Sequence, residues 1–224
     1  MVKKQLRSVY RILGVLFCLS GSVQAEKYTY DEIANRIFWR DLYSQGGWSL
    51  YCGFRFDGNG RTGSGGHVRI DHIYPMTRML KKVNCDSRQQ CRESGNRLFI
   101  EMEADLHNLY PVWWEIASTN SDSSFGELPG EEWRFDNCDY ERKLGVIEPR
   151  PIARGNIARA ILYMHAKYGV ELDRKTFVLM KKWNLEDPPS KQEKSRNNII
   201  ESIQGNRNPY IDNPKLVNLI VFKE

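Results

Sequence analysis

Asp71 and His72 are neighbours in the sequence, and their side chains have complementary chemistry. An unperturbed imidazole is mostly neutral at about pH 7 and can accept a proton, and a carboxylate can hold Mg²⁺ or Mn²⁺ through oxygen. Together with an arginine, the pair could supply the activated water, the phosphate neutralisation and the leaving-group stabilisation that phosphodiester hydrolysis requires. Asp-His pairs also occur as ordinary surface residues at strand ends, so the pair alone leaves both interpretations open.

The residues before this pair predict a strand that ends beside it. Val68, Ile70 and His72 alternate with Arg69 and Asp71, which is the period of a strand. Such a strand would point Asp71 and His72 to opposite faces unless it ends there. The proline that follows favours an ending close to the pair.

The segments on either side are predicted to be short or irregular. Residues 46–66 alternate glycine-rich turns with aromatic and aliphatic residues, which predicts short strands joined by tight turns. Residues 76–98 are polar and rich in Arg and Lys, so we expect a long ordered loop. A short helix is expected over residues 112–119.

Helix signals dominate the later part of the chain. In residues 151–168, Pro151 suits the first helical turn and Gly169 suits the position after the helix. Two further helices are expected, one after Asp173 and one over residues 191–204. Several helices and few strands together predict a mixed α+β fold.

The N-terminus has the pattern of a secretory signal peptide. Four basic residues precede an apolar run over residues 12–19, and small and polar residues follow up to Ala25. This run is far shorter than the roughly 20 residues that cross a bilayer, so we expect cleavage after residue 25 and a domain over residues 26–224. The leader holds four of the 33 basic residues and none of the 28 acidic ones, so the formal charge falls from +5 to +1 and identifies no partner.

Four cysteines follow the leader, namely Cys52, Cys85, Cys91 and Cys138. An even number in an exported chain favours disulfides, and none of the spacings is the two-to-four-residue gap typical of zinc sites. Three pairings are possible. We favour Cys85 with Cys91, which closes a short loop, and Cys52 with Cys138, which joins distant segments.

Seven short sequence blocks carry a family resemblance. In chain order they are Tyr51-Cys52-Gly53, Asp71-His72-Ile73-Tyr74-Pro75, Asp105-Leu106-His107-Asn108-Leu109-Tyr110-Pro111, Glu115-Ile116, Phe125-Gly126-Glu127, the run from Glu148 to Arg159, and the run from Gln204 to Tyr210. With these blocks the sequence resembles the bacterial endonuclease I family of periplasmic or secreted non-specific nucleases. The resemblance covers most of the chain after the leader and implies a His-Me finger (ββα-metal) fold.

The resemblance also implies roles for individual residues. His72 matches the family's general base, and Asp71 occupies the place of a metal-binding glutamate; the shorter side chain keeps a hard oxygen donor. Arg88, three residues before Cys91, matches an arginine that contacts the cleaved phosphate. A solvated loop arginine is the alternative for Arg88.

The second metal ligand is where the sequence departs from the family. The family has an asparagine after Glu-Ile, followed three residues later by arginine, whereas this chain has Ala117 and Asn120 at those positions. Alanine cannot bind a metal. Asn120 lies one helical turn further on and is the expected substitute, with Asp122 as a second candidate.

Three arginines in the sixth block, Arg150, Arg154 and Arg159, are candidates for contacts with nucleic-acid phosphates. Ordinary solvated helix charges are the alternative. Residues 206–210 are expected to form a turn that supports the site.

Other side chains in or near the blocks are expected to be structural. His107 and Asn108 should satisfy loop backbone groups as buried polar side chains. The tryptophans Trp113, Trp114 and Trp133 are expected in the core rather than as platforms for base stacking.

These expectations combine into a secreted or periplasmic endonuclease that uses Mg²⁺ or Mn²⁺. Its substrate would be DNA, with RNA as a second candidate, and sequence preference should be small because no groove-reading module is recognisable. We expect a monomer without membrane association after leader cleavage. One alternative, motivated by Ala117, is a nuclease fold that binds nucleic acid or another extracellular partner without catalysis. A disulfide-stabilised exported domain of structural role is the other.

Overall fold

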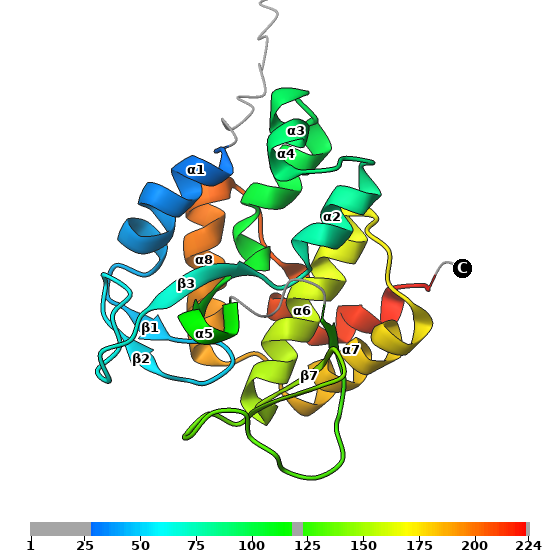
Figure 1. Ribbon diagram of the computed structural model, residues 1–224. Helices are drawn as coiled ribbons and strands as arrows, with labels where there is room; N and C mark the ends of the chain where they lie inside the picture. Colours follow the sequence, from blue (N-terminus) through cyan, green and yellow to red (C-terminus); the bar gives the residue numbers. More distant parts are fainter. Residues whose placement is uncertain (1–27, 118–122, 223–224) are drawn as a thin grey trace, which may run out of the picture.

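The structure is a computed structural model that describes residues 28–117 and 123–222. The predicted signal peptide, residues 1–25, lies outside these residues and stays a prediction. Figure 1 shows a helix-rich molecule with short strands, which confirms the predicted α+β class. None of the described helices combines the length and the apolar character that crossing a bilayer would require.

Short strands alternate with helical segments along the described chain. The helical segments are α1 (Tyr30–Glu32), η1 (Ile33–Leu42), α2 (Met76–Lys82), α3 (Arg88–Glu93), α4 (Arg97–Ala104), η2 (Leu106–Asn108), α5 (Trp114–Ala117), α6 (Pro151–Tyr168), α7 (Arg174–Glu186), α8 (Lys191–Gln204), α9 (Pro209–Asp212) and η3 (Pro214–Leu219). The strands are β1 (Gly47–Trp48), β2 (Arg55–Phe56), β3 (Val68–His72), β4 (Leu109–Trp113), β5 (Ser124–Phe125), β6 (Tyr140–Lys143) and β7 (Val146–Pro149).

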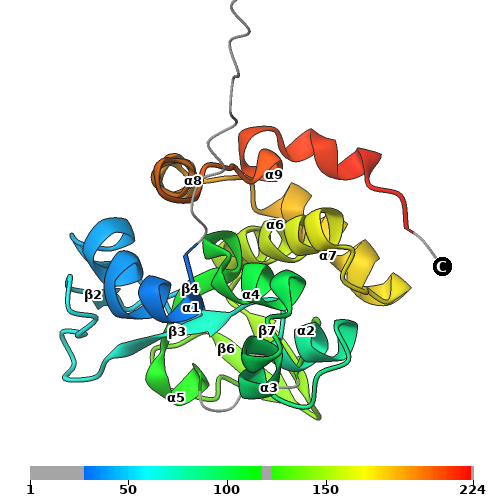
Figure 2. The same ribbon diagram turned by 90° about the horizontal axis from the view of Figure 1, so that it is seen from above.

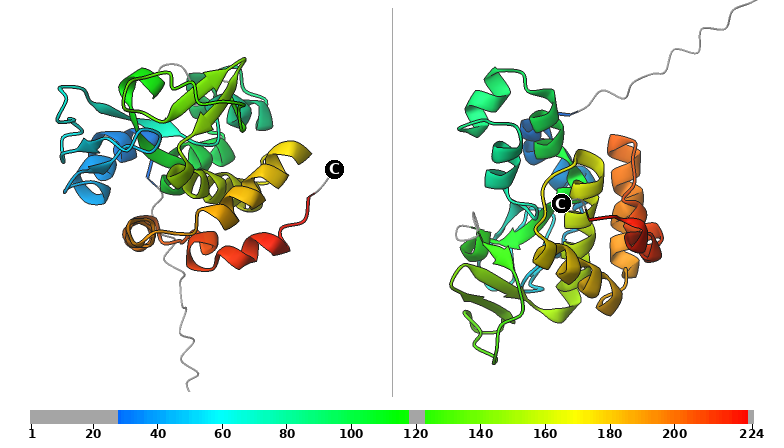
Figure 3. Two further views of the ribbon diagram at one scale, coloured as in Figure 1. Left: turned by 90° about the horizontal axis from the view of Figure 1, so that it is seen from below. Right: turned by 90° about the vertical axis from the view of Figure 1, so that its right-hand side faces the viewer.

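Within the described residues the strands form three small sheets. β1 pairs with β2, β3 pairs antiparallel with β4, and β7 lies between β5 and β6. The β3–β4 pair runs from Val68 opposite Trp113 to His72 opposite Leu109. The hairpin of β6 and β7 projects at the end of the molecule opposite α3 and α4 (Figure 3).

The three later helices are where the sequence predicts them. Pro151 occupies the first turn of α6, and Gly169 ends it in the left-handed conformation that glycine adopts without strain. Asp173 and Ser190 cap α7 and α8 by accepting hydrogen bonds from backbone N–H groups of the first turn. Figure 2 shows α8 and α9 on one side of α6 and α2 to α4 on the other, so α6 lies at the centre of the packing.

The predicted long loop over residues 76–98 is wrong. Three helices begin in this range, because buried Met79, Cys91 and Phe99 give each helix an apolar contact that its polar composition hides. Ser87 and Asn96 provide the N-caps of α3 and α4. The short helix predicted over residues 112–119 begins only at Trp114, because β4 continues to Trp113; residues 118 and 119 lie outside the described residues.

Both predicted disulfides are confirmed. Cys52 bonds to Cys138 across a sequence separation of 86, and Cys85 bonds to Cys91 across a separation of 6. The longer bridge ties the segment after β1 to the segment before β6. The shorter one closes the loop that leads into α3.

The prediction that the three tryptophans are core residues is wrong for two of them. Trp113 packs against the main core and contacts Phe135 edge to face. Trp114 and Trp133 are 37% and 52% exposed. Trp114 begins α5 and stacks on His67, whereas the Trp133 indole donates to the Glu131 carboxylate.

Candidate active site

The β3–β4 hairpin followed by α5 has the ββα arrangement of a His-Me finger, and it places Asp71 and His72 at the end of β3. The strand ends here because Ile73 N–H donates to the Asn108 carbonyl, after which the chain turns through Pro75 into α2. The Asn108 side chain accepts from Tyr74 N–H at 2.6 Å and donates to the Tyr74 carbonyl at 3.2 Å. The turn that aims His72 is therefore held by a buried side chain from the segment that leads into β4.

The His72 imidazole is held in one orientation by two contacts. Its Nε2 lies 2.9 Å from the backbone carbonyl oxygen of Glu103, in α4. A carbonyl only accepts, so Nε2 carries the proton in this contact and Nδ1 keeps its lone pair. The Tyr30 ring stacks on the imidazole with centroids 5.3 Å apart. The arrangement gives a neutral histidine whose second nitrogen can take a proton.

The electrostatic surroundings keep this histidine neutral. Burial, together with the positive charges of Arg88 and Arg92, lowers the pKa of His72 to about 4, against the opposing effects of the Glu103 carbonyl and carboxylate. At neutral pH the imidazole is accordingly a proton acceptor rather than a cation.

Arg88 lies beside His72 in a charged cluster. Its Nε donates to the Glu103 carboxylate at 2.6 Å, and Arg92 donates to the same carboxylate from Nε and Nη2 at 2.8 and 2.9 Å. Arg88 also lies over the Tyr30 ring, 4.6 Å from its centroid. Its side chain is 40% exposed, whereas that of Glu103 is 2% exposed. Arg88 is therefore not a solvated loop residue. It is the first residue of α3, Glu103 orients its guanidinium, and part of its side chain is exposed to solvent.

Asp71 is the described carboxylate that fits a hard cation. One of its oxygens, Oδ1, accepts a hydrogen bond from His72 N–H at 2.9 Å, and the residue is half-buried. Mg²⁺ is typically held by one or two carboxylates, with waters and substrate phosphate completing its shell. The Asp71 carboxylate is therefore a suitable ligand for Mg²⁺. No cluster of three acidic, histidine or cysteine ligands exists within residues 28–117 and 123–222. The proposed second ligands, Asn120 and Asp122, lie outside the described residues.

Asp71 and His72 belong to different faces of the hairpin. Asp71 is opposite Tyr110 and His72 is opposite Leu109, and paired residues share a face. Asp71 and His72 nevertheless lie at the same end of the hairpin.

The Tyr30 phenol completes the surroundings of His72. Burial raises the pKa of Tyr30 against the opposing effect of the Arg88 guanidinium, so the phenol that stacks on His72 stays neutral at pH 7.

The second aspartate-histidine motif is structural. Asp105 Oδ2 accepts hydrogen bonds from Tyr163, Lys167 and Tyr168 at 2.6 to 2.8 Å. His107 is buried, and its Nε2 lies 3.2 Å from the Asn206 carbonyl, within the turn predicted to support the site. The structural roles predicted for His107 and Asn108 are confirmed.

The three arginines of the sixth block have different environments. Arg150 donates to the backbone carbonyls of Leu50 and Ser49, and Arg154 donates to the Glu148 carboxylate at 2.6 Å. Both are half-buried and remain candidates for phosphate contact. Arg159 is 0% exposed, and its guanidinium binds the buried carboxylate of Glu193.

The prediction of a phosphate contact is therefore corrected for Arg159. Its helix face, which sequence alone does not reveal, turns toward α8. A guanidinium enclosed in this way cannot reach a surface ligand.

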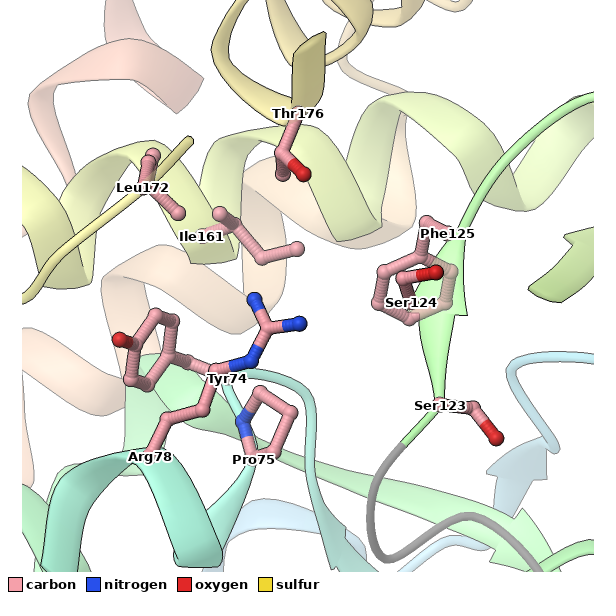
Figure 4. Close-up of a pocket in the computed structure, with 9 residues that line it drawn as sticks. All are labelled: Tyr74, Pro75, Arg78, Ser123, Ser124, Phe125, Ile161, Leu172 and Thr176. Atoms are coloured by element: carbon pink, nitrogen blue, oxygen red, sulfur yellow. The ribbon is translucent and has the colours of Figure 1, made fainter. Parts of the chain in front are cut away.

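The space directly behind the motif is too small for a substrate. A cavity of about 10 Å³ is lined by the residues labelled in Figure 4, which shows the Arg78 guanidinium pointing toward Ile161 and Thr176. This volume is about that of one water. Tyr74 and Pro75 line this cavity together with Ile161 of α6, so it offers no room for a nucleotide beside these two motif residues.

Two residues of the site were missed in the sequence. Glu103 could have been noticed as an acidic residue among the apolar positions of a helical segment, two residues before Asp105. Tyr30 gives no such signal, because only the capping box between Thr29 and Glu32 hints that a helix starts there. Tertiary packing alone brings Tyr30 to His72.

Comparisons with known proteins agree with this geometry. The sequence model of the family described as Endonuclease I matches residues 22–215. Endonuclease-1 of Buchnera aphidicola subsp. Acyrthosiphon pisum (strain APS) is 30% identical over 184 residues, which cover 79% of this chain and 70% of the relative. A periplasmic deoxyribonuclease of Aeromonas hydrophila is 26% identical, covering 89% of this chain and 92% of the relative. An extracellular ribonuclease of Bacillus amyloliquefaciens is 32% identical over 50% of this chain and 44% of the relative. The His-Me finger and these matches together show that the chain belongs to the endonuclease I family.

Proposed function

We propose that this protein is a metal-dependent endonuclease that hydrolyses phosphodiester bonds of DNA, and of RNA as a second substrate, with little sequence preference. The observation that carries the proposal is the neutral His72 imidazole, held through Nε2 by the Glu103 carbonyl beside the partly open guanidinium of Arg88. The names of the relatives, which include deoxyribonucleases and ribonucleases, support both substrate classes.

In the proposed reaction, His72 Nδ1 accepts a proton from the attacking water. The Glu103 carbonyl and Tyr30 hold the ring so that this nitrogen stays in place without reorganisation. Arg88, oriented by the Glu103 carboxylate, neutralises charge on the cleaved phosphate.

Asp71 would hold one Mg²⁺ or Mn²⁺ ion, with Asn120 or Asp122 as the proposed second ligand. When bound, the ion would supply Lewis-acid neutralisation of the scissile phosphate. The Asp71 carboxylate, which is fixed by the His72 N–H, is suited to this because it needs no further ordering to present an oxygen.

Nucleic-acid contacts should be mainly to phosphates, with Arg150 and Arg154 as the candidates outside the hairpin. Such binding weakens steeply with salt. The relatives named as periplasmic or extracellular enzymes support action outside the cytoplasm after removal of residues 1–25.

The test is digestion of supercoiled plasmid by oxidised, leader-free protein, with Mg²⁺ and with chelator, beside His72→Ala. We expect nicking that requires the metal and that falls by about 10²- to 10⁴-fold in the variant. Thermal unfolding of the variant serves as the control for folding. Nicking by His72→Ala at the rate of the unchanged protein would overturn the proposed base.

A second candidate function is a binding module without catalysis. Ala117 motivates it, because this residue cannot bind a metal and it ends α5, the helix of the finger. Retardation of DNA in a gel without nicking under any metal condition would support this alternative. Loss of nicking in Asn120→Ala or Asp122→Ala would argue for a substitute ligand.

A further inference from the structure

A second group of residues with binding chemistry lies at the other end of β3. The His67 imidazole and the Trp114 indole stack with centroids 5.7 Å apart and an angle of 7° between their planes. Arg69 Nε donates to His67 Nε2 at 3.3 Å. All three side chains are exposed. We call His67, Arg69 and Trp114 the stacking patch.

The geometry of the stacking patch is built into the fold. Trp114 N–H donates to the His67 carbonyl, which fixes the start of α5 beside the start of β3. Gly66, which precedes His67, lies close to both indole N–H groups: a Cβ there would lie 3.0 Å from Trp113 Nε1 and 3.7 Å from Trp114 Nε1. The backbone hydrogen bond therefore keeps the two residues side by side, and each ring has one face that its partner does not cover.

The charge of the stacking patch is positive. Arg69 has no ion-pair partner among the residues that the structure describes, and its bond to His67 uses Nε. The two terminal amino groups of its guanidinium are thus available to an anion next to the rings. A planar, stacked surface beside an unneutralised arginine suits a base and its phosphate.

The stacking patch is continuous with the proposed metal ligand. Arg69 and Asp71 lie two residues apart in β3, and His67 directly precedes the strand in an extended bridge with Arg61, so the three side chains follow one face. The distance from Asp71 to His67 along this strand is about 13 Å at the usual rise per residue. A polynucleotide strand held at Asp71 would pass Arg69 on this face and reach the rings within a few nucleotides.

We propose that the stacking patch binds an unpaired nucleobase, so that the preferred substrate is nucleic acid with a single-stranded segment beside the cleaved bond. This inference rests on the proposed nuclease function. A base inside a duplex is stacked on its neighbours and paired, so it cannot lie on Trp114 without being extruded, whereas a single strand offers its bases freely. Arg69 holds the adjoining phosphate.

Another exposed tryptophan provides a matched control. Trp133 is 52% exposed, more than Trp114, but its indole N–H donates to the Glu131 carboxylate. An acidic neighbour repels phosphate. The proposal therefore assigns base binding to Trp114 and not to Trp133, although exposure alone would favour Trp133.

The test is binding of fluorescent oligonucleotides to leader-free, oxidised His72→Ala protein, followed by anisotropy. Three probes of equal length are used: a single strand, its duplex, and a strand made entirely of abasic sites. We expect the single strand to bind more tightly than the duplex. Trp114→Ala should weaken single-strand binding by about tenfold, Trp114→Phe should restore most of it, and Trp133→Ala should have no effect. Binding of the abasic strand should not respond to Trp114→Ala, whereas Arg69→Gln should weaken both strands.

The outcomes separate this inference from the function on which it rests. Single-strand binding that is unchanged in Trp114→Ala, or lowered equally by Trp133→Ala, overturns the stacking patch and leaves the nuclease proposal intact. An equal loss for the abasic strand would also overturn base stacking. If no probe binds, the stacking patch is overturned, and the plasmid assay decides independently whether the nuclease proposal holds.

Discussion

The two aspartate-histidine motifs of this chain have similar sequences and opposite environments. Asp71 and His72 lie at the end of strand β3 in a two-stranded hairpin, and their side chains are half-buried. The Arg88 side chain beside them is partly exposed. Asp105 and His107 are both buried. The carboxylate of Asp105 is saturated by donors from α6, whereas the Nδ1 lone pair of His72 remains open to a proton.

Residue type alone therefore does not separate chemistry from architecture. A carboxylate that receives several hydrogen bonds and an ammonium group is held in its charged form and cannot exchange ligands without loss of stability. A neutral imidazole fixed through one nitrogen is ready to take a proton through the other. The two motifs can be distinguished by how much stability and how much nicking activity are lost when their residues are substituted.

The greatest loss of stability is expected in Asp105→Asn. Asp105 Oδ2 is the acceptor for Tyr163, Lys167 and Tyr168, so the variant leaves buried donors and an ammonium group unmatched. We expect a loss of about 3 kcal/mol in the free energy of unfolding, measured by urea denaturation. Asp71→Asn should lose less than about 1 kcal/mol while reducing nicking. Equal stability losses in the two variants would remove the distinction between the motifs.

The pH dependence of stability should show the same contrast. Burial lowers the pKa of His107 to about 4, so between about pH 6.5 and pH 4 the unfolded chain takes up a proton that the folded protein excludes. Stability should fall by on the order of 2–3 kcal/mol as the pH is lowered through this range.

The test of this pH dependence compares His107→Gln with its parent, both in the His72→Ala background because the pKa of His72 is lowered as well. The glutamine variant does not titrate, so its stability should vary less with pH across this range. Parallel curves for the two proteins would contradict the assignment to His107.

Removal of the Cys85–Cys91 disulfide should have a smaller effect on stability. The Cys85–Cys91 bridge closes the loop that contains Arg88. Cys85→Ser with Cys91→Ser should cost about 2 kcal/mol of stability on the chain-entropy model. Nicking measured well below the melting temperature should fall further than the fraction of folded protein explains, since Arg88 loses its anchorage. A fall that matches the unfolded fraction would mean that the loop is merely stabilising.

Glu103→Gln should cost less stability than loss of the short disulfide. Its partners Arg88 and Arg92 are partly exposed, so in the variant their guanidinium groups can turn to solvent. We expect a loss of about 1 kcal/mol in the free energy of unfolding. The kcat should fall about tenfold with KM nearly unchanged, because Arg88 is no longer oriented while the Glu103 carbonyl still holds His72.

Glu101→Gln on the same helix, which removes the partner of the exposed Arg97, is the control for Glu103→Gln. It should change neither kcat nor stability by a measurable amount. An unchanged kcat in Glu103→Gln would show that Arg88 does not need this carboxylate.

The features that could be predicted from the sequence are those that follow local rules. Helix α6 begins at a proline and ends at a glycine, and β3 follows an alternating pattern, because caps and periodicity act within a few residues. The number of cysteines predicted two disulfides, the favoured one of three possible pairings is the one observed, and the order of the motif blocks indicated the family.

Which polar groups are enclosed and which are open depended instead on tertiary packing. Packing turned a polar stretch into α2, α3 and α4, brought Tyr30 and Glu103 to His72, enclosed Arg159 against Glu193, and left Trp114 exposed beside His67. The physical reason is that burial and ion pairing depend on segments far apart in the chain. Their sequences fix the charges and shapes that each can offer, but packing alone fixes which of them meet.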